Sequence, residues 1–493
     1  MTNLSDLFPA GAGKQVSFTA SGNVTSSGKP VILNTNGTVT QVTSNSVAGA
    51  VGSAATYQSS TAFETAATFD SDNNKVVVAF QGPSNYGYAV VGTVSGTSIS
   101  WGSPVAFSST NTARYMAATF DSNTNRVVIA YQDFSNNSYG TAIVGQVSGT
   151  SISFGTPTVF AAENACNDFA ATFDSTNNKV VIAYRNSSNY GDAIVGTVTG
   201  GGTNSIAFGT KDQYTTGTAQ YNAITFDPDT NQVIIAFGDT SQPDGKVLTA
   251  SVSGTSINCA TPVVFSSNSA RPGRDDGIAY DSASNKVVIA YADVTQSDDG
   301  YAIVGTVDGT TLTFGTAVQF DAGTVDPPQI SYNAAANKHV IAFTDHTNSS
   351  YGEYVVGTVS GTAISFSSSA TFESGGTNYL AITYDSNEEK TVVAFADTGH
   401  SNYGKGVAIQ PAYTTTNLTA TNFIGVSDAA ISSAASGNIT IKGGIAATGL
   451  SSLTPGSDYY VQIDGTFGTS ADDPSVKAGK ALSATVLNLE YTS

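Results

Sequence analysis

Arginine, tyrosine, asparagine and aspartate side chains recur along this chain in segments that otherwise differ from one another. Guanidinium, carboxylate and amide groups form directional hydrogen bonds with hydroxyls and carboxylates, and tyrosine rings offer a flat face for stacking. If the fold brings these side chains together, they could bind the hydroxyls and the ring face of a sugar. The alternative for any single one is an ordinary solvated loop residue. The candidate ligand-binding residues are Arg114, Tyr115, Asn167, Asp168, Tyr221, Arg274, Asp275 and Tyr379.

The same segments offer little for catalysis. Asp168 and Asp275 are candidate carboxylates for glycoside hydrolysis by location alone, because that reaction depends on a geometry that the sequence does not reveal. The three histidines have no metal-ligand spacing and form no Ser-His-Asp pattern. No glycine loop of the phosphate-binding type is present. We therefore expect no enzyme, no cofactor and no metal site, with a glycan depolymerase (a glycoside hydrolase or lyase) as the alternative.

The candidate residues belong to a sequence unit that occurs seven times. Each copy has a short segment ending in Phe-Asp or Tyr-Asp (Tyr-Asn in the sixth copy), a tight turn, and a run of valine, isoleucine and alanine. The successive pivots are 51, 53, 53, 54, 52 and 52 residues apart. A period near 50 with several short strands is typical of a β-propeller. The pivots are Asp70, Asp121, Asp174, Asp227, Asp281, Asn333 and Asp385.

Each copy predicts one propeller blade of four antiparallel strands. In the third copy the strands are expected over residues 170–174, 179–184, 193–198 and from 205 onwards. The first strand opens with small residues, so we expect it to be innermost. The second is apolar on both faces, as expected when each face packs on a neighbouring blade. The fourth contains Gly-x-Pro in the first two copies, at Gly102-Ser103-Pro104 and Gly155-Thr156-Pro157, which suits an outer edge.

The seventh copy lacks its fourth strand, and residues 51–60 align with the fourth strand of the first copy. We therefore predict an all-β fold in which an N-terminal strand completes the seventh blade and closes the ring. The predicted domains are an N-terminal β segment over 1–50, the seven-bladed propeller over 51–411, and a C-terminal β-rich domain over 412–493. Both termini would then form one small β-rich base, with a hairpin expected over residues 31–42 and strands over 422–426, 437–442, 458–463 and 481–489.

Two sets of turns are nearly uniform among the copies, whereas the connections between copies vary. In a four-stranded blade the uniform turns all lie on one face and the variable connections lie on the opposite face, so binding is expected at the variable face. The uniform turns, such as Asp70-Ser-Asp72, also resemble calcium loops, but they lack the glycine and closing glutamate of an EF-hand. We interpret them as Asx turns that join two strands.

The composition excludes several classes of function. A net charge of −19, from 18 Lys and Arg against 37 Asp and Glu, argues against nucleic-acid binding. No apolar run is long enough to predict a membrane span. Residues 1–9 lack the basic and apolar regions of a secretory signal. Cys166 and Cys259 occupy non-equivalent positions and predict no disulfide framework.

Four segments near the C-terminus resemble the terminal region of structural proteins from tailed bacteriophages, of the tail-fibre-like or virion type. A segment like residues 21–42 often accompanies that region, with a variable domain between them. The resemblance covers about 120 residues, all outside the seven repeats. The C-terminal segments are residues 422–430, 449–461, 464–468 and 477–485.

The resemblance implies a virion-surface protein, made in the host cytoplasm, whose base contacts other virion proteins. It also implies recognition of a host-cell surface component, most plausibly a glycan, by the propeller. It transfers no catalytic residues. The alternatives are a capsid or tail decoration protein without a receptor role, and a glycan depolymerase. A homo-oligomer is a further hypothesis, although no coiled-coil heptads support it.

Overall fold

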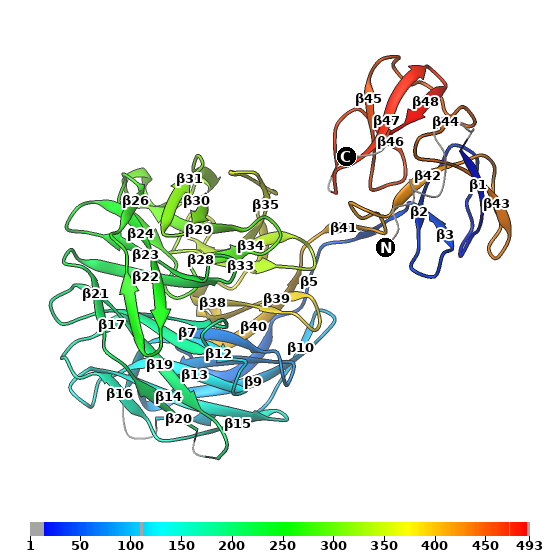
Figure 1. Cartoon of the computed structure of the whole chain (residues 1–493). Coiled ribbons are helices and arrows are strands. Elements are labelled where there is room, and N and C mark those ends of the chain that lie inside the picture. The colour runs from blue at the N-terminus through cyan, green and yellow to red at the C-terminus, as the bar shows by residue number, and fades with distance from the viewer. Residues whose placement is uncertain (1–13, 109–111, 203, 473, 491–493) are drawn as a thin grey trace. The chain divides into compact units, whose positions relative to one another are not determined.

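The computed structural model describes residues 14–108, 112–202, 204–472 and 474–490. Over these residues the protein is all-β, with short 3-10 turns and no α-helix (Figure 1). The chain divides into two compact units, one of residues 48–411 and one of residues 1–47 with 412–493. In the described part of the chain, no helix is long and apolar enough to cross a bilayer. Residues 1–9, where we expected no signal segment, lie outside the described residues.

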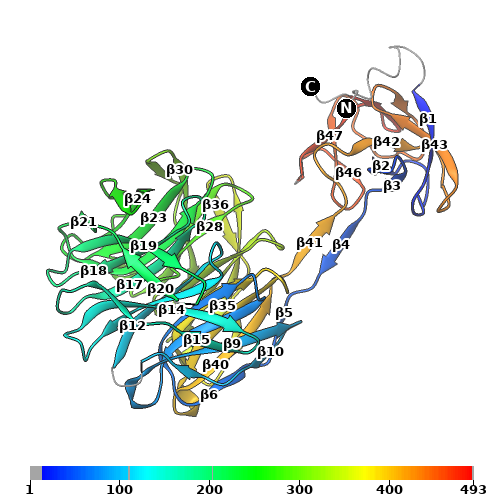
Figure 2. The ribbon, with the colours of Figure 1, turned by 60° about the horizontal axis from the view of Figure 1, so that its bottom comes forward.

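The larger unit contains seven antiparallel sheets, one for each sequence repeat (Figures 1 and 2). The first strand of each repeat forms one edge of its sheet. These first strands lie beside one another in order, and that of the first repeat also lies beside that of the last. In the fifth repeat the strand is in two pieces, β27 (Ala270–Pro272) and β28 (Ile278–Asp281). The other first strands are β7 (Phe63–Asp70), β12 (Ala113–Asp121), β17 (Asn167–Asp174), β22 (Ala219–Asp227), β33 (Gln329–Asn333) and β38 (Thr377–Asp385).

The second and third strands form the middle of each sheet. The second strands are β8 (Lys75–Gln81), β13 (Arg126–Asp133), β18 (Lys179–Arg185), β23 (Gln232–Asp239), β29 (Lys286–Asp293), β34 (Lys338–Asp345) and β39 (Lys390–Asp397). The third strands are β9 (Gly87–Ser95), β14 (Tyr139–Ser148), β19 (Gly191–Thr199), β24 (Asp244–Ser253), β30 (Asp299–Asp308), β35 (Tyr351–Ser360) and β40 (Tyr403–Gln410).

Each second strand is buried on both faces, as its unbroken apolar run predicted. In β13, Val127 and Ile129 join a core cluster shared with the first repeat, whereas Val128 and Ala130 join one shared with the third repeat. All four side chains are fully buried. Since side chains alternate across a strand, one continuous apolar run supplies both interfaces of a sheet.

The outer strand differs from the prediction, because it is divided into two pieces. Both pieces pair with the third strand of the same sheet. Gly-x-Pro stands at the division in the first two repeats, but the strand is also divided where no proline is present, as at Gly209-Thr210-Lys211 and Gly315-Thr316-Ala317. The pairs are β10 (Ser98–Trp101) with β11 (Val105–Ala106), β15 (Ser151–Phe154) with β16 (Thr158–Ala161), β20 (Ser205–Phe208) with β21 (Asp212–Thr215), β25 (Ser256–Cys259) with β26 (Val263–Ser266), β31 (Thr311–Phe314) with β32 (Val318–Asp321), and β36 (Ala363–Phe366) with β37 (Ala370–Glu373).

The outer strand of the seventh sheet comes from the N-terminal side of the chain. There, β5 (Ala50–Val51) and β6 (Ala55–Thr61) both pair with β40. Gly52, which follows β5, packs against the turn of the first repeat, and a Cβ there would lie 1.8 Å from the Thr97 carbonyl oxygen. Gly102 has the same relation to Thr150 of the second repeat, at 1.9 Å. The N-terminal segment therefore contacts the first repeat in the same way as the outer strand of the first repeat contacts the second repeat.

The turns after the first strands are Asx turns, as interpreted from the sequence. Asp70 Oδ1 accepts from the backbone nitrogens of Asp72 and Asn73, at 3.1 and 2.9 Å. The same pair of bonds recurs after Asp121, Asp174, Asp227, Asp281 and Asp385. Hydrogen bonding to the backbone therefore accounts for the recurrence of the pivot aspartate.

The smaller unit combines strands from both ends of the chain. Its first sheet places β1 and β2 beside C-terminal strands, and β4 pairs with β41. The predicted hairpin at residues 31–42 is present as β2 and β3. Residues 481–489, expected as one strand, instead turn near Ala484 and belong to β47 and β48. The strands are β1 (Gln15–Thr19), β2 (Pro30–Leu33), β3 (Val39–Gln41), β4 (Ser44–Val47), β41 (Tyr413–Thr416), β42 (Phe423–Ser427), β43 (Ser436–Ile441), β44 (Ile445–Ala446), β45 (Asp458–Val461), β46 (Phe467–Gly468), β47 (Val476–Ser483) and β48 (Val486–Leu489).

Substitutions of Tyr57 in β6 test how much the N-terminal strand contributes to the stability of the larger unit. Its ring packs on Phe80 and on Trp101, with centroids 5.2 and 5.3 Å apart. Tyr57→Ala should lower the free energy of unfolding by about 3–5 kcal/mol, because it leaves a cavity between the first and last sheets. Tyr57→Phe should cost little, since the hydroxyl is buried without a partner. Denaturant unfolding followed by fluorescence of the single tryptophan, Trp101, measures both. Equal costs would contradict this account.

Candidate ligand-binding site

A bulge interrupts the first strand in five of the seven repeats. The register shifts between Phe63 and Ala66 in β7, and at equivalent places in β12, β17, β22 and β38. The sixth residue before each pivot lies in this bulge or at the matching position of the fifth and sixth repeats. These residues are Glu64, Tyr115, Asp168, Tyr221, Asp275, Pro327 and Tyr379.

The six of these residues that are not proline have left-handed backbone, with φ between 50° and 69°. This conformation costs a non-glycine residue about 1–2 kcal/mol, so the surrounding structure must enforce it. Here the bulge re-aims the side chain out of the strand's alternation. In the bulged repeats this side chain therefore departs from the regular alternation of its strand.

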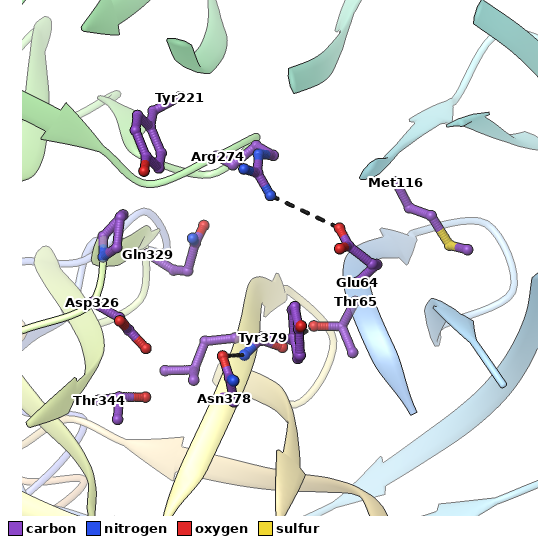
Figure 3. Close-up of a pocket in the computed structure, with 12 residues that line it drawn as sticks. Glu64, Thr65, Met116, Tyr221, Arg274, Asp326, Gln329, Thr344, Asn378 and Tyr379 are labelled. Atoms are coloured by element: carbon purple, nitrogen blue, oxygen red, sulfur yellow. Dashed lines mark hydrogen bonds and ion pairs between the residues drawn. The ribbon is translucent and has the colours of Figure 1, made fainter. Parts of the chain in front are cut away.

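A cavity of about 200 Å³ opens where several of these bulges meet. Figure 3 shows side chains from several strands arranged around it, with Arg274 reaching toward Glu64. Its wall combines two tyrosine rings with carboxylate, amide, hydroxyl and guanidinium groups. The lining residues are Glu64, Thr65, Met116, Tyr221, Arg274, Asp326, Pro327, Gln329, Thr344, Asn378, Tyr379 and Leu380.

Arg274 is held on several sides. Its Nε lies 2.8 Å from Asp168 Oδ1, and its Nη1 lies 3.8 Å from Glu64 Oε2. The guanidinium carbon is 5.1 Å from the ring centre of Tyr115 and 5.7 Å from that of Tyr221, within cation–π distance. These contacts fix the side chain at the cavity wall, where 30% of it remains exposed.

Glu64 is the acidic partner of Arg274 at the cavity. Its Oε2 also accepts from the backbone nitrogen of Tyr115, at 3.2 Å. Burial raises the pKa of the Glu64 carboxyl above its ordinary value, and the Arg274 guanidinium offsets only part of this effect.

Gln329 offers an acceptor without a partner. The residue is 6% exposed, it lines the cavity, and its Oε1 is buried with no hydrogen-bond donor in the described structure. An unpaired buried amide oxygen costs about 1–3 kcal/mol. A ligand that donates a hydrogen bond here would recover this cost. Thr344, also in the wall, is already bonded to Thr377 across 2.9 Å.

The loop between β27 and β28 crosses the space between the first strands. Asp275 Oδ2 accepts from Ala118 N of the second repeat at 3.1 Å, and Oδ1 accepts from Ala171 N of the third at 2.8 Å. Asp276 faces the seventh repeat, where Ile382 N lies 3.4 Å from its Oδ2. The carboxylates of one loop therefore tie distant sheets together behind Arg274.

Close packing explains why glycines flank this loop. A Cβ on Gly273 would lie 2.0 Å from the Pro328 carbonyl oxygen, and one on Gly277 would lie 2.4 Å from Gly273 N. The fifth repeat has three additional residues before its pivot, and these form the loop. Asp281 lies eleven positions after Ala270, whereas Asp227 lies eight positions after Ala219 in the fourth repeat.

The structure brings together some of the residues that we selected from the sequence and separates others. Tyr221, Arg274 and Tyr379 line the cavity. Tyr115 and Asp168 support Arg274 from behind, and Asp275 is buried in contacts with the backbone.

Two selected residues are outside the cavity wall. Arg114 is exposed and lies over the Phe134 ring at 4.8 Å. Asn167 Oδ1 accepts from Arg185 Nε at 2.6 Å. Both immediately precede a bulged residue in their strands, Tyr115 and Asp168. The bulged residues Tyr115 and Asp168 contact Arg274 beside the cavity, whereas the residue that precedes each of them does not line the cavity.

Several cavity residues were missed in the sequence. Glu64 holds the same position relative to its pivot as Tyr115 and Tyr379, so the repeat alignment could have found it. It was overlooked because the segment before the first repeat was not treated as a connection between repeats. Asp326 and Gln329 flank Pro327 and Pro328 in the sixth repeat. Nothing in the sequence distinguishes them from other polar loop residues.

One group of carboxylates has the composition of a metal site and lies away from the cavity wall. The oxygens of Asp321, Asp345 and Glu353 are within 4.8 Å of one another. Each carboxylate also accepts a hydrogen bond from its own repeat, for example Asp345 from Thr347 N at 2.8 Å and Asp321 from Gly323 N at 2.7 Å. These bonds account for the arrangement, and we assign no ion to it. The sequence did not predict this cluster.

Comparisons with known proteins bear on the fold alone. No family model matches the chain, and no curated protein matches it. One similar solved structure is the SapL1 lectin in complex with alpha methyl fucoside. It has 12% identity and a TM-score of 0.37, over 64% of this chain and 98% of the lectin. Another is the leech intramolecular trans-sialidase complexed with 2,7-anhydro-Neu5Ac. It has 7% identity and a TM-score of 0.42, over 72% of this chain and 68% of that enzyme.

The expectation that this protein is not an enzyme requires correction. The leech trans-sialidase, which is an enzyme, is among the similar solved structures. We therefore no longer exclude catalysis. Similarity at this level assigns no reaction to this chain either.

The buried pair Asp275 and Asp276 predicts a pH-dependent stability. Burial raises the pKa of Asp275 to about 7 and raises that of Asp276 well above its ordinary value, with Asp275 adding charge repulsion. For Asp275 the folded protein holds the proton more tightly than the unfolded chain does. The resulting stabilisation is complete below about pH 4 and is lost as the pH rises toward 7. The loss is at most about 4 kcal/mol.

Asp275→Asn removes one titrating group and should flatten this dependence. We expect the thermal midpoint of the unmodified protein to fall more steeply between pH 4.5 and 8 than that of Asp275→Asn. Asp72→Asn, at an exposed turn, controls for loss of one carboxylate. Parallel pH profiles for the protein and Asp275→Asn would rule out this role for Asp275.

Proposed function

We propose that the protein is a surface component of a tailed-bacteriophage particle and that its larger unit binds a sugar of the host-cell surface. In this proposal the unit is a closed seven-bladed β-propeller. The contacts of the first repeat with the last, and the pairing of β5 and β6 with β40, support closure. The smaller unit would attach the protein to other virion proteins. The resemblance of residues 422–430 and 449–461 to phage structural proteins supports that role.

The cavity carries the binding part of the proposal, and one observation carries it furthest. Gln329 Oε1 is a buried acceptor in the wall without a donor. Sugars supply hydroxyl donors on a ring whose apolar face stacks on aromatic side chains. Tyr221 and Tyr379 provide such rings in the same wall, and Tyr379 is 36% exposed. A small sugar residue suits a cavity of about 200 Å³.

Gln329→Met tests the proposal because it separates stability from binding. The substitution removes the unpaired acceptor with little change of volume, so the free protein should be as stable or slightly more stable. Affinity for the sugar should fall about tenfold, since one hydrogen bond to the ligand is lost. Tyr379→Ala should also weaken binding about tenfold through the lost stacking face. Phe134→Ala is the control, because this ring is exposed and outside the cavity wall.

Binding is measured with the full chain on a panel of immobilised glycans and on intact bacterial cells. Saturable binding that Gln329→Met and Tyr379→Ala weaken, and Phe134→Ala leaves unchanged, is the expected result. Binding that all three variants retain would place the sugar elsewhere. Complete lack of binding by folded protein would favour the decoration role without receptor recognition.

The location on a virion has a separate test. Antibodies raised against the larger unit should label intact phage particles in electron micrographs. A chain shortened to residues 48–411 should fail to join particles when it replaces the full chain during assembly, although it remains folded by circular dichroism. Incorporation of the shortened chain at the normal level would remove the attachment role from the smaller unit.

A further inference from the structure

We infer that the cavity selects sugars that are uncharged or carry an amine, and that it rejects sugars that carry a carboxylate. This inference rests on the proposed function, because it assumes that a sugar occupies the cavity. It goes further by naming the chemical class of that sugar from the charges and hydrogen-bonding groups of the wall.

The first argument is the balance of charge. The carboxylates of Glu64 and Asp326 line the cavity, and Asp168 lies directly behind Arg274. Asp168 has a second cation, Arg185, whose Nε is 3.3 Å from its Oδ2. Among the groups that line the cavity or support its wall, three carboxylates thus meet two guanidinium groups, while Arg114 acts on Glu64 from outside the wall and Arg271 is paired with Asp298 at 3.3 Å. The chain as a whole carries −19, which adds a repulsive field for anions.

The second argument is that Arg274 is already engaged. Guanidinium recognises a carboxylate best through two parallel hydrogen bonds from one edge of its fork. In Arg274 the Nε is bonded to Asp168, and Nη1 faces Glu64 (Figure 3). The Tyr115 and Tyr221 rings lie against the guanidinium plane. An acidic sugar would have to compete with carboxylates that the protein itself holds in place.

The third argument is the excess of acceptors. Glu64 and Asp326 line the cavity with carboxylates, of which Asp326 Oδ1 is paired with His346 Nε2 at 2.9 Å, and the buried Gln329 Oε1 has no donor within the described residues. A hydroxyl or an ammonium group satisfies such oxygens by donating. A ligand carboxylate can only accept, so it would leave Gln329 unpaired and lie close to like charge. The cost in binding free energy of the unpaired acceptor and of the like charges therefore selects against acidic sugars.

The test uses sets of sugars that share ring stereochemistry and differ only in charge. Each set contains the neutral sugar, its 2-amino form and its 6-carboxylate, for example galactose, galactosamine and galacturonate, then the glucose and mannose sets. Affinities for the full chain are measured by calorimetry at pH 8 in low salt. In any set that binds, we expect the carboxylate to bind at least about tenfold more weakly than the neutral sugar. The amino sugar should bind at least as tightly as the neutral one.

Removing the charge of a carboxylate in the cavity wall distinguishes electrostatic repulsion of the acidic sugar from its steric exclusion. The Asp326 side chain is 41% exposed and pairs with His346 Nε2 at 2.9 Å, so Asp326→Asn removes the charge at a surface contact, and Glu64→Gln keeps the shape of the side chain. Either substitution should reduce the preference for the neutral sugar over the acid severalfold. Asp72→Asn, an exposed turn residue away from the cavity wall, changes the net charge equally and should leave the preference unchanged. Raising the salt concentration should also reduce the preference.

The outcomes distinguish this inference from the proposed function. If a neutral sugar binds and its carboxylate form binds equally well or better, sugar binding stands and this inference is overturned. If Glu64→Gln and Asp326→Asn both leave the preference unchanged, the charge argument is wrong, because shape alone must then exclude the acid. If no sugar in any set or in the glycan panel binds the folded chain, the proposed function fails and this inference fails with it.

Discussion

The larger unit depends on one requirement, which is that each sheet buries both of its faces against the neighbouring sheets. The alternating burial of Val127 and Val128 in different core clusters shows how a single strand meets it. An isolated sheet of this kind would expose two apolar faces to water, so no repeat is expected to be stable alone. The N-terminal strands follow from the same requirement, since Tyr57 and Gly52 fill the positions that an outer strand occupies in the other sheets.

The candidate site depends on a local exception to this packing. At each bulge the first strand leaves its regular alternation, and the left-handed residue directs its side chain away from the core. The loop from Arg271 to Gly277 uses the freed space, and its two aspartates accept hydrogen bonds from three other repeats. That loop positions Arg274 at the cavity wall. Binding chemistry and structural support therefore come from adjacent residues of one segment.

Much of the fold could be predicted from the sequence, because it follows from periodicity. The strand positions, the burial of the second strand and the Asx turns all depend on residues close together in the chain. The division of the outer strand was not predicted, because it also occurs in repeats whose outer strand has no Gly-x-Pro. The turn near Ala484 carries no glycine or proline signal, which is why one strand was expected there.

The site was less predictable, because it depends on contacts between distant repeats. Tyr221 and Tyr379 were found as variable residues in equivalent segments. Arg114 met the same description and lies outside the cavity wall, since one position along a bulge decides whether a side chain turns inward. That Asp275 would bond with Ala118 and Ala171, rather than face a ligand, could be seen only in three dimensions.

The bulged position has a consequence for how such a protein can evolve. Because four of the seven bulged or matching positions line the cavity, substitutions at Glu64, Tyr221, Pro327 and Tyr379 alter the cavity while the scaffold persists. The repeats also share their spacing and their turns, so recombination between gene segments could exchange whole repeats in register. A lineage under selection for new ligands could thereby sample new binding surfaces by point substitution at four codons or by shuffling complete units.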